Sequence, residues 1–317
     1  MRTTNAFLLL PLVLLAASAS ASAQKIILTN DDGWATAQIR AQNDALKALG
    51  FDVILSAPAE NQSGTGSSSA PPQPRTDPCE FESCPAGSGA TGFDSSDPRL
   101  NFVNSFPVDA ARFGIQTLAP EIFGSKPDFV VSGPNVGTNL GPGITGSGTV
   151  GAASEGSLEG IPSVAFSGAS TSQESFTNLV SSPTSTSIRA AQLYAALTAQ
   201  FTRTLLAPTS RPVLPPNITL NVNFAPISSK CSAPGDFKFI LTRLAADSDA
   251  TDVRTCGSSH LPNEIEVAAI QVITGKCIAT VSVISAVDQK DVDASSQAFV
   301  LDRMGSSFFS CLLDVVL

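Results

Sequence analysis

The fold is decided first at residues 25–33, which read KIILTNDDG. The first five residues form a short apolar run, and the Asn, Asp and Gly that follow are typical of a turn, so the stretch predicts a buried strand that feeds a loop. Residues 36–49 then place Ile39, Leu46 and Leu49 at near-helical spacing and stop at Gly50. Residues 51–56 form a second apolar run. Together these segments predict a right-handed β-α-β unit with parallel strands.

The same alternation continues along the chain. We expect strands at 100–104, 127–132, 162–166 and 218–223, and helices at 108–118, 149–158 and 185–205. Strands dominate afterwards, at 237–244, 264–273 and 277–287, the last two joined as a hairpin at Thr274-Gly275-Lys276. The pattern therefore predicts an α/β fold, a doubly wound and mostly parallel sheet with a β-rich C-terminal extension.

The N-terminus predicts export. Arg2, the apolar residues 7–17 and the small residues 21–23 form a signal peptide over 1–23, which makes Gln24 the mature start. We expect a catalytic core over 24–225 with a loop insertion at 58–98. The β-rich part, 226–317, is expected to pack on the core or serve in oligomerisation. No later segment is long and apolar enough to span a bilayer, so the predicted location is extracellular.

Six cysteines in an exported chain favour disulfides. Cys79 and Cys84 are near neighbours in one loop, which favours a local bridge, whereas sequence alone leaves the full pairing open. Asn61-Gln62-Ser63 and Asn217-Ile218-Thr219 are glycosylation sequons.

Charge limits the ligands. The net charge is −9, and no cluster of Lys and Arg is visible, so a nucleic-acid polymer is disfavoured. A small phosphorylated substrate remains compatible, because one metal ion can supply the local positive charge.

Three polar segments follow predicted strands, where open parallel sheets bind their ligands. The first contains Asp31 and Asp32. Adjacent carboxylates repel each other and would be relieved by a hard cation, although Asp is also an ordinary turn and capping residue. The second, residues 57–64, contains Ser63, which is either a neutral oxygen ligand or a simple loop residue.

The third polar segment, residues 132–149, is rich in glycine and precedes a predicted helix. Glycine permits close backbone approach, and a helix N-terminus offers N–H groups to an anion, so this segment predicts a phosphate cradle. A flexible glycine-rich turn is the alternative. A GxGxxG match at Gly141, Gly143 and Gly146 does not lie directly between a strand and its helix, which disfavours dinucleotide binding.

Several other chemistries are disfavoured. The chain has no GxSxG, no Walker A motif and no HExxH. It also lacks CxxC, and His260 is its single histidine, in a loop typical of a surface position.

Taken in order, these segments resemble the SurE family of survival-protein phosphatases and 5′-nucleotidases. The resemblance is carried by residues 26–33, 57–64, 127–141, 147–150, 155–162 and 221–224. It implies a Rossmann-like core with a divalent metal at the strand ends. The export signal and the enlarged 58–98 loop are features of secreted, fungal-type members.

The resemblance also implies roles for individual residues. The family's metal ligands fall on Asp31, Asp32, Ser63 and Asn135, a donor set suited to Mg²⁺ or Mn²⁺. Asp31 and Asp32 are the catalytic candidates, and whether Asp31 is a base, a nucleophile or only a ligand stays open. The substrate phosphate is assigned to Asn135, Ser147, Gly148 and Thr149. Homo-oligomerisation is compatible with the resemblance.

The leading hypothesis is therefore a secreted, metal-dependent acid phosphatase or 5′-nucleotidase acting on small phosphomonoesters. The alternative is a secreted SurE-fold protein without turnover that acts as a binding or host-interaction module. Retention of all four ligand positions favours the enzyme. A phosphodiesterase acting on nucleic acid is disfavoured by the absence of a basic groove.

Overall fold

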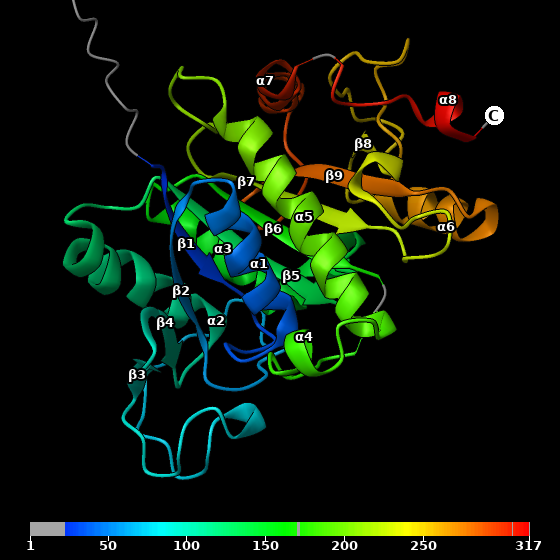
Figure 1. Ribbon diagram of the computed structural model, residues 1–317. Coiled ribbons are helices and arrows are strands. Elements are labelled where there is room, and N and C mark those ends of the chain that lie inside the picture. The colour runs from blue at the N-terminus through cyan, green and yellow to red at the C-terminus, as the bar shows by residue number, and fades with distance from the viewer. Residues whose placement is uncertain (1–22, 170–171, 306, 317) are drawn as a thin grey trace, which may run out of the picture.

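A nine-stranded sheet crosses the molecule in the order β3-β4-β2-β1-β5-β6-β7-β9-β8 (Figure 1). The computed structural model describes residues 23–169, 172–305 and 307–316, so the predicted signal peptide lies outside the described residues except for Ala23. The strands are β1 (Lys25–Thr29), β2 (Asp52–Pro58), β3 (Thr91–Asp94), β4 (Asp97–Val103), β5 (Phe129–Val136), β6 (Ser163–Gly168), β7 (Ile218–Phe224), β8 (Lys238–Thr242) and β9 (Ile278–Ser285).

The central strands are parallel, as predicted. β4, β2, β1, β5, β6 and β7 pair in parallel, whereas β3 is antiparallel to β4 at one edge. Near the other edge β9 is antiparallel to β7, and β8 is parallel to β9. The C-terminal extension thus adds its strands to the same sheet.

Helices cover both faces of the sheet. The side chains of β1 alternate between the two faces and so pack against helices on each side. Ile26 and Leu28 pack with the core that contains α1 (Ala37–Ala48) and α5 (Thr186–Leu206), which contact each other. Ile27 belongs to a second cluster on the other face, beneath a π-helix (Gly114–Phe123) that continues α2 (Pro107–Phe113). α3 (Gly148–Leu158) lies beside α2 and contacts β5 and β6.

The remaining helices are short or lie in the last third of the chain. They are α4 (Asn178–Ser181), α6 (Glu264–Thr274), α7 (Ala294–Met304) and α8 (Leu312–Val316), with 3-10 turns at Glu80–Glu82, Gly141–Gly146 and Pro234–Asp236.

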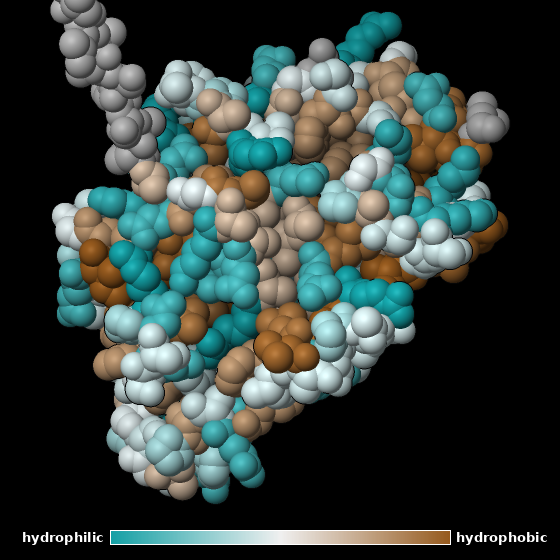
Figure 2. Space-filling view, viewed as in Figure 1, coloured by the Kyte–Doolittle hydropathy of each residue, from teal (hydrophilic) through white to brown (hydrophobic). Residues whose placement is uncertain are grey.

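The strand predicted at 264–273 is wrong, and so is the hairpin built on it, because this segment is helix α6. The Asn263 side chain accepts hydrogen bonds from the backbone N–H groups of Ile265 and Glu266, and Gly275 ends the helix in the left-handed conformation. These end signals outweigh the β-branched composition. The helix leaves Val272 and Ile273 exposed, and Figure 2 shows hydrophobic colour over this part of the surface.

All six cysteines are paired. The predicted local bridge between Cys79 and Cys84 is confirmed, and the other two are Cys231–Cys277 and Cys256–Cys311. The last two both tie residues beyond 226 to one another.

The strand order reverses between β1 and β5. The chain moves from β1 through α1 to β2 on one side, while β5 adjoins the opposite side of β1 and leads into α3. Helices leaving two adjacent strands toward opposite faces open a crevice at the carboxyl ends of those strands, and ligands of doubly wound folds bind there. The Asp31–Asp32 turn follows β1, and Asn135 lies near the end of β5.

Candidate functional site

The turn after β1 is closed by its own side chains. The Asn30 side-chain amide donates to the carbonyl of Gly33 at 3.0 Å, and the Gly33 N–H donates back to Asn30 Oδ1 at 3.2 Å. Gly33 has a φ of +110°, a conformation that glycine adopts without strain. This local fold buries both carboxylates, leaving Asp31 2% and Asp32 0% exposed.

Asp31 points at the start of α3. The Thr149 hydroxyl donates to Asp31 Oδ1 at 2.5 Å. A methyl group on Gly148 would lie only 2.8 Å from the Asp31 Cβ, so glycine is required for this approach. Burial raises the pKa of Asp31 above its usual range, and hydrogen bonds from Thr149 and the Gly148 backbone partly oppose that rise.

Asp32 is held by two other segments. The backbone N–H of Val136 donates to Asp32 Oδ2 at 2.8 Å, and the Gln173 amide donates to Asp32 Oδ1 at 2.7 Å. Burial, followed by the charge of Asp31, raises the pKa of Asp32 to about 7. Among the described residues, no Lys, Arg or His forms an ion pair with either carboxylate. Two adjacent buried acids without a basic partner make a strong demand for a cation.

Asn135 directly precedes Val136, whose backbone holds Asp32. A register shift between Ser132 and Asn135 interrupts the pairing of β5 with β6. The Asn135 amide nitrogen donates to the carbonyl of Gly137 at 2.8 Å, whereas its buried Oδ1 has no hydrogen-bond partner within the described part of the chain. A buried carbonyl oxygen without a donor fits a metal ligand, since a cation would satisfy it.

Ser63 is placed differently. The backbone N–H of Gln62 donates to the Asp31 carbonyl at 2.7 Å, so this loop runs beside the turn. The Ser63 residue is exposed, and its backbone N–H donates to Asn61 Oδ1. The described residues contain no group of three or more His, Cys, Asp or Glu able to hold a metal. A cation here would therefore rest on Asp31 and Asp32 together with neutral oxygens, a donor set that Mg²⁺ and Mn²⁺ accept.

The start of α3 lies directly against Asp31. Ser147 caps the helix by accepting from the Val150 N–H, and both Ser147 and Thr149 are buried. The helix N-terminus concentrates N–H groups and positive dipole at this point, which suits an anion. The Thr149 hydroxyl donates to Asp31. The phosphate-binding role predicted for Thr149 from the sequence stays a prediction.

Sequence reasoning missed two residues that touch the turn. Gln173 follows β6, the next strand after β5 in the sheet, and the strand-end rule could have identified it. Glu80 begins the 3-10 turn Glu80–Glu82, and no local sequence pattern marks it as a site residue. Glu80 Oε1 accepts from the Ala35 N–H at 3.2 Å, and its carboxyl occupies the space that a Cβ on Gly33 would need. Burial raises the pKa of Glu80 to about 8.

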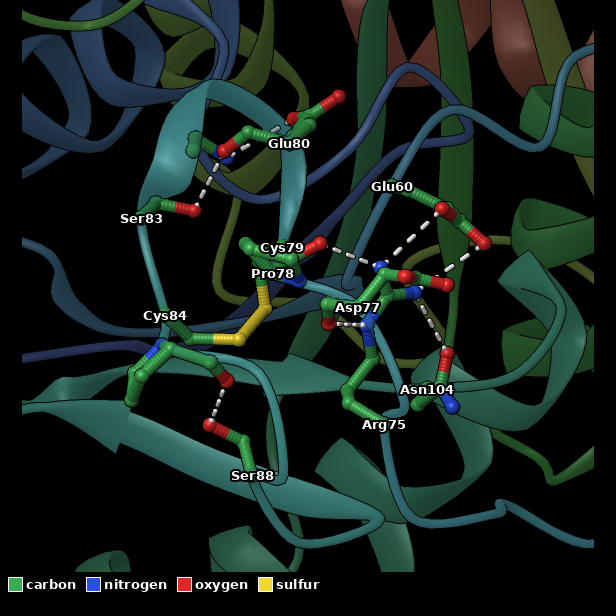
Figure 3. Close-up of a disulfide and its surroundings, with 12 residues drawn as sticks. Glu60, Arg75, Asp77, Pro78, Cys79, Glu80, Ser83, Cys84, Ser88 and Asn104 are labelled. Carbon is green, nitrogen blue, oxygen red and sulfur yellow. Dashed lines mark hydrogen bonds and ion pairs between the residues drawn. A yellow bond between two sulfur atoms is a disulfide. The ribbon is translucent and has the colours of Figure 1, made fainter.

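The Cys79–Cys84 bridge fixes the loop that carries Glu80 (Figure 3). We call residues 79–84 with this disulfide the clasp. Arg75 organises the approach to it, donating to the carbonyl of Pro78 at 2.6 Å and pairing with Glu60 at 3.1 Å.

Comparison with known proteins finds matches to one family. The family model described as "Survival protein SurE" matches residues 26–249. An acid phosphatase of Yarrowia lipolytica is 34% identical over 293 residues, covering 82% of this chain and 78% of that protein. The 5′-nucleotidase SurE of Desulforudis audaxviator is 36% identical over 152 residues, 48% of this chain and 53% of that protein. The crystal structure of the SurE protein from Aquifex aeolicus aligns with a TM-score of 0.56 at 24% identity, over 82% of this chain and 93% of that one, which supports the fold.

Proposed function

Because this chain belongs to the SurE family of 5′-nucleotidases and acid phosphatases, we propose that it is an exported, divalent-metal-dependent phosphatase. Its proposed substrates are small phosphomonoesters such as nucleoside monophosphates. The observation that carries the proposal is the buried Asp31–Asp32 pair, to which the described residues offer no basic partner. Asp32 is bonded to the backbone of Val136, and the neighbouring Asn135 carries a buried Oδ1 without a hydrogen-bond partner among the described residues.

The proposed metal ligands are Asp31, Asp32, Asn135 and Ser63. The cation would supply positive charge that polarises the phosphoryl group and favours attack by water. Thr149 orients Asp31 through its hydroxyl, and Val136 and Gln173 fix the two oxygens of Asp32. In this arrangement the carboxylates reach the reaction already aligned, without ordering cost at the moment of turnover.

The phosphate group is assigned to the start of α3. We propose that Ser147, Gly148 and Thr149 receive it, with Asn135 at the side of the site. The buried start of an eleven-residue helix lies directly against Asp31, so a phosphate there would be next to the proposed metal. Asp31 would then either accept the proton of the attacking water, or attack phosphorus and displace the ester oxygen, which leaves as an alcohol after taking a proton from solvent.

Export is part of the same proposal. No described helix is long and apolar enough to cross a membrane. Three disulfides fit an oxidising compartment. Asn61 and Asn217 are both exposed, so both sequons are accessible to glycosylation. N-terminal sequencing of the protein from culture medium should begin at Gln24.

The test is hydrolysis of p-nitrophenyl phosphate by the purified protein with EDTA, Mg²⁺ or Mn²⁺, between pH 5 and 8. We expect activity with metal and none with EDTA, and a loss of at least about 100-fold in Asp32→Asn. Asp44→Asn is the matched control, because Asp44 is exposed on α1. Mg²⁺ should raise the unfolding temperature of the wild type but not of Asp32→Asn. A folded protein that is inactive with every metal would favour the binding module instead.

A further inference from the structure

We propose that Glu264, at the start of α6, is a positioning residue that holds the loop leading into the phosphate site. This inference rests on the proposed function and extends it to a residue outside the region matched by the family model, which ends at 249. It also gives a role to the Asn221–Asn223 segment of β7, which the function has not so far used.

Glu264 is fully buried and accepts hydrogen bonds at both of its carboxyl oxygens. The backbone N–H of Gly141 donates to Glu264 Oε1 at 2.6 Å, and the Ser282 hydroxyl donates to Glu264 Oε2 at 2.7 Å. The Asn221 amide lies 3.4 and 3.5 Å from the two oxygens. Several donors thus converge on one carboxyl group. Burial raises the pKa of Glu264 to about 7, with these hydrogen bonds opposing the rise.

The bond to Gly141 reaches the functional loop. The 3-10 turn Gly141–Gly146 begins at this residue and runs directly into Ser147, the cap of α3. Gly141 has a φ of +67°, and a Cβ there would lie 2.5 Å from Ile265 Cδ1, so α6 sits tightly against the loop. A shift of Gly141 would therefore be transmitted to the start of α3.

The residue two positions earlier is held from β7. The side-chain amides of Asn221 and Asn223 both donate to the Asn139 carbonyl, at 2.9 and 2.8 Å, and the Asn139 N–H donates to Asn223 Oδ1 at 2.8 Å. The loop is thus anchored at Asn139 by β7 and at Gly141 by α6. Glu264 joins the two anchors, because it contacts both Gly141 and Asn221.

A merely structural role would make Glu264 a link between α6 and the sheet. Its bond to Ser282 serves that purpose, since Ser282 lies on β9 and also shares a hydrogen bond with Thr242 of β8. The bond to Gly141 serves the loop. The hydrogen bonds at the two carboxyl oxygens can therefore be tested separately. Ser282→Ala removes the bond to the sheet and is the matched control for a purely structural role.

Two variants separate the length of the Glu264 side chain from its charge. Glu264→Asp keeps the charge but withdraws the carboxyl by roughly 1.5 Å, one C–C bond, so it cannot contact both Gly141 and Ser282. Glu264→Gln keeps the reach. Its amide oxygen can accept from Gly141, and its NH₂ can donate to Ser282, whose own proton can turn to Thr242.

The experiment measures KM and kcat for p-nitrophenyl phosphate with Mg²⁺, and Ki for inorganic phosphate. For Glu264→Asp we expect KM and Ki to rise about tenfold, the effect of one lost hydrogen bond to a charged group, with kcat changed less than about threefold. Glu264→Gln should stay within about threefold of the wild type in KM and Ki. Ser282→Ala should lower the unfolding temperature and leave both constants unchanged.

Three outcomes would overturn the proposal while the wild type remains active: unchanged constants in Glu264→Asp, a larger defect in Glu264→Gln than in Glu264→Asp, or an equal rise in Ser282→Ala. An inactive wild type would instead overturn the proposed function, and the Glu264 role with it. The Mg²⁺-induced rise in unfolding temperature should be the same in all four proteins, because none of these changes touches the proposed metal ligands.

Discussion

Replacing Thr149 by Val should damage both the stability and the activity of this protein. The two side chains have nearly the same shape, so the change removes one hydroxyl from a fully buried position. That hydroxyl donates to Asp31 Oδ1 at 2.5 Å, and Val would place a methyl group against the carboxyl oxygen. The variant thus removes the side-chain hydrogen bond to Asp31 and leaves that carboxyl with its backbone donors.

The expected cost is about 2 kcal/mol, because a short buried hydrogen bond is lost and a methyl group is placed against a buried carboxyl oxygen. For a chain of this length it corresponds to a fall of about 4 °C in the unfolding temperature. Misorientation of Asp31 should also lower kcat by about tenfold or more. The assays are urea and thermal unfolding of the EDTA-treated protein, and p-nitrophenyl phosphate hydrolysis with Mg²⁺.

Thr198→Val is the matched control. Thr198 is equally buried, in α5, but its hydroxyl has no hydrogen-bond partner among the residues described. Its removal relieves an unsatisfied polar group, so stability should stay within about 0.5 kcal/mol or rise. Equal stability changes in the two variants, or full activity in Thr149→Val, would refute the role assigned to the Thr149–Asp31 hydrogen bond.

Two further predictions concern pH and the clasp. The pKa of Asp32 is raised to about 7, above its ordinary 3.8, so the folded state holds a proton that the unfolded chain releases. The free energy of unfolding of the EDTA-treated protein should therefore increase as the pH falls from 7.5 to 5, and Mg²⁺ should reduce this difference; urea midpoints at both pH values measure it. The double variant Cys79→Ser/Cys84→Ser frees the loop that carries Glu80 and should lower kcat about three- to tenfold. Loss of the Cys256–Cys311 bridge, distant in sequence from the turn, should leave kcat unchanged, and equal kcat in both disulfide variants would count against the clasp.

Much of the core could be predicted because its signals are local. The residues at 25–33 predict a strand followed by a turn, and Gly50 marks the end of α1. Ser147 marks the start of α3 in the same way, since its hydroxyl caps the first turn. The strand-end rule then gathers Asp31 and Asn135 at one edge without any knowledge of side-chain packing.

α6 shows where two local signals compete. Ile265, Val267 and Ile273 favour a strand by composition, whereas Asn263 and Gly275 mark the two ends of a helix. The end signals decide the structure, because they satisfy backbone groups that would otherwise be left without partners at the helix ends. α6 begins at Glu264, and the side chain at this helix start accepts from the Gly141 N–H.

Other site residues lie beyond any local argument. Glu264 meets Gly141 across 123 positions. Glu80 reaches Ala35 only through a loop whose course depends on the clasp. Contacts at such separations are set by strand order and by how the loops pack, and a single sequence carries no periodic pattern for either.

The electrostatics of the site lead to a last prediction. Asp31 and Asp32 are acidic and buried, the net charge is −9, and among the described residues no basic side chain pairs with either acid. The N-terminus of α3 carries only about half a positive charge, which is too little to offset two carboxylates and a phosphate dianion. Without a cation, the site should therefore repel the phosphate it is proposed to bind. At pH 8, above the pKa of about 7 of Asp32, isothermal titration of inorganic phosphate into the EDTA-treated protein should show no binding, and Mg²⁺ should restore it. In Asp32→Asn, the metal-independent affinity should increase because one negative charge is gone. Equal phosphate affinity with and without metal would mean that the chain alone holds the anion, and the proposed role of the cation in substrate binding would fall.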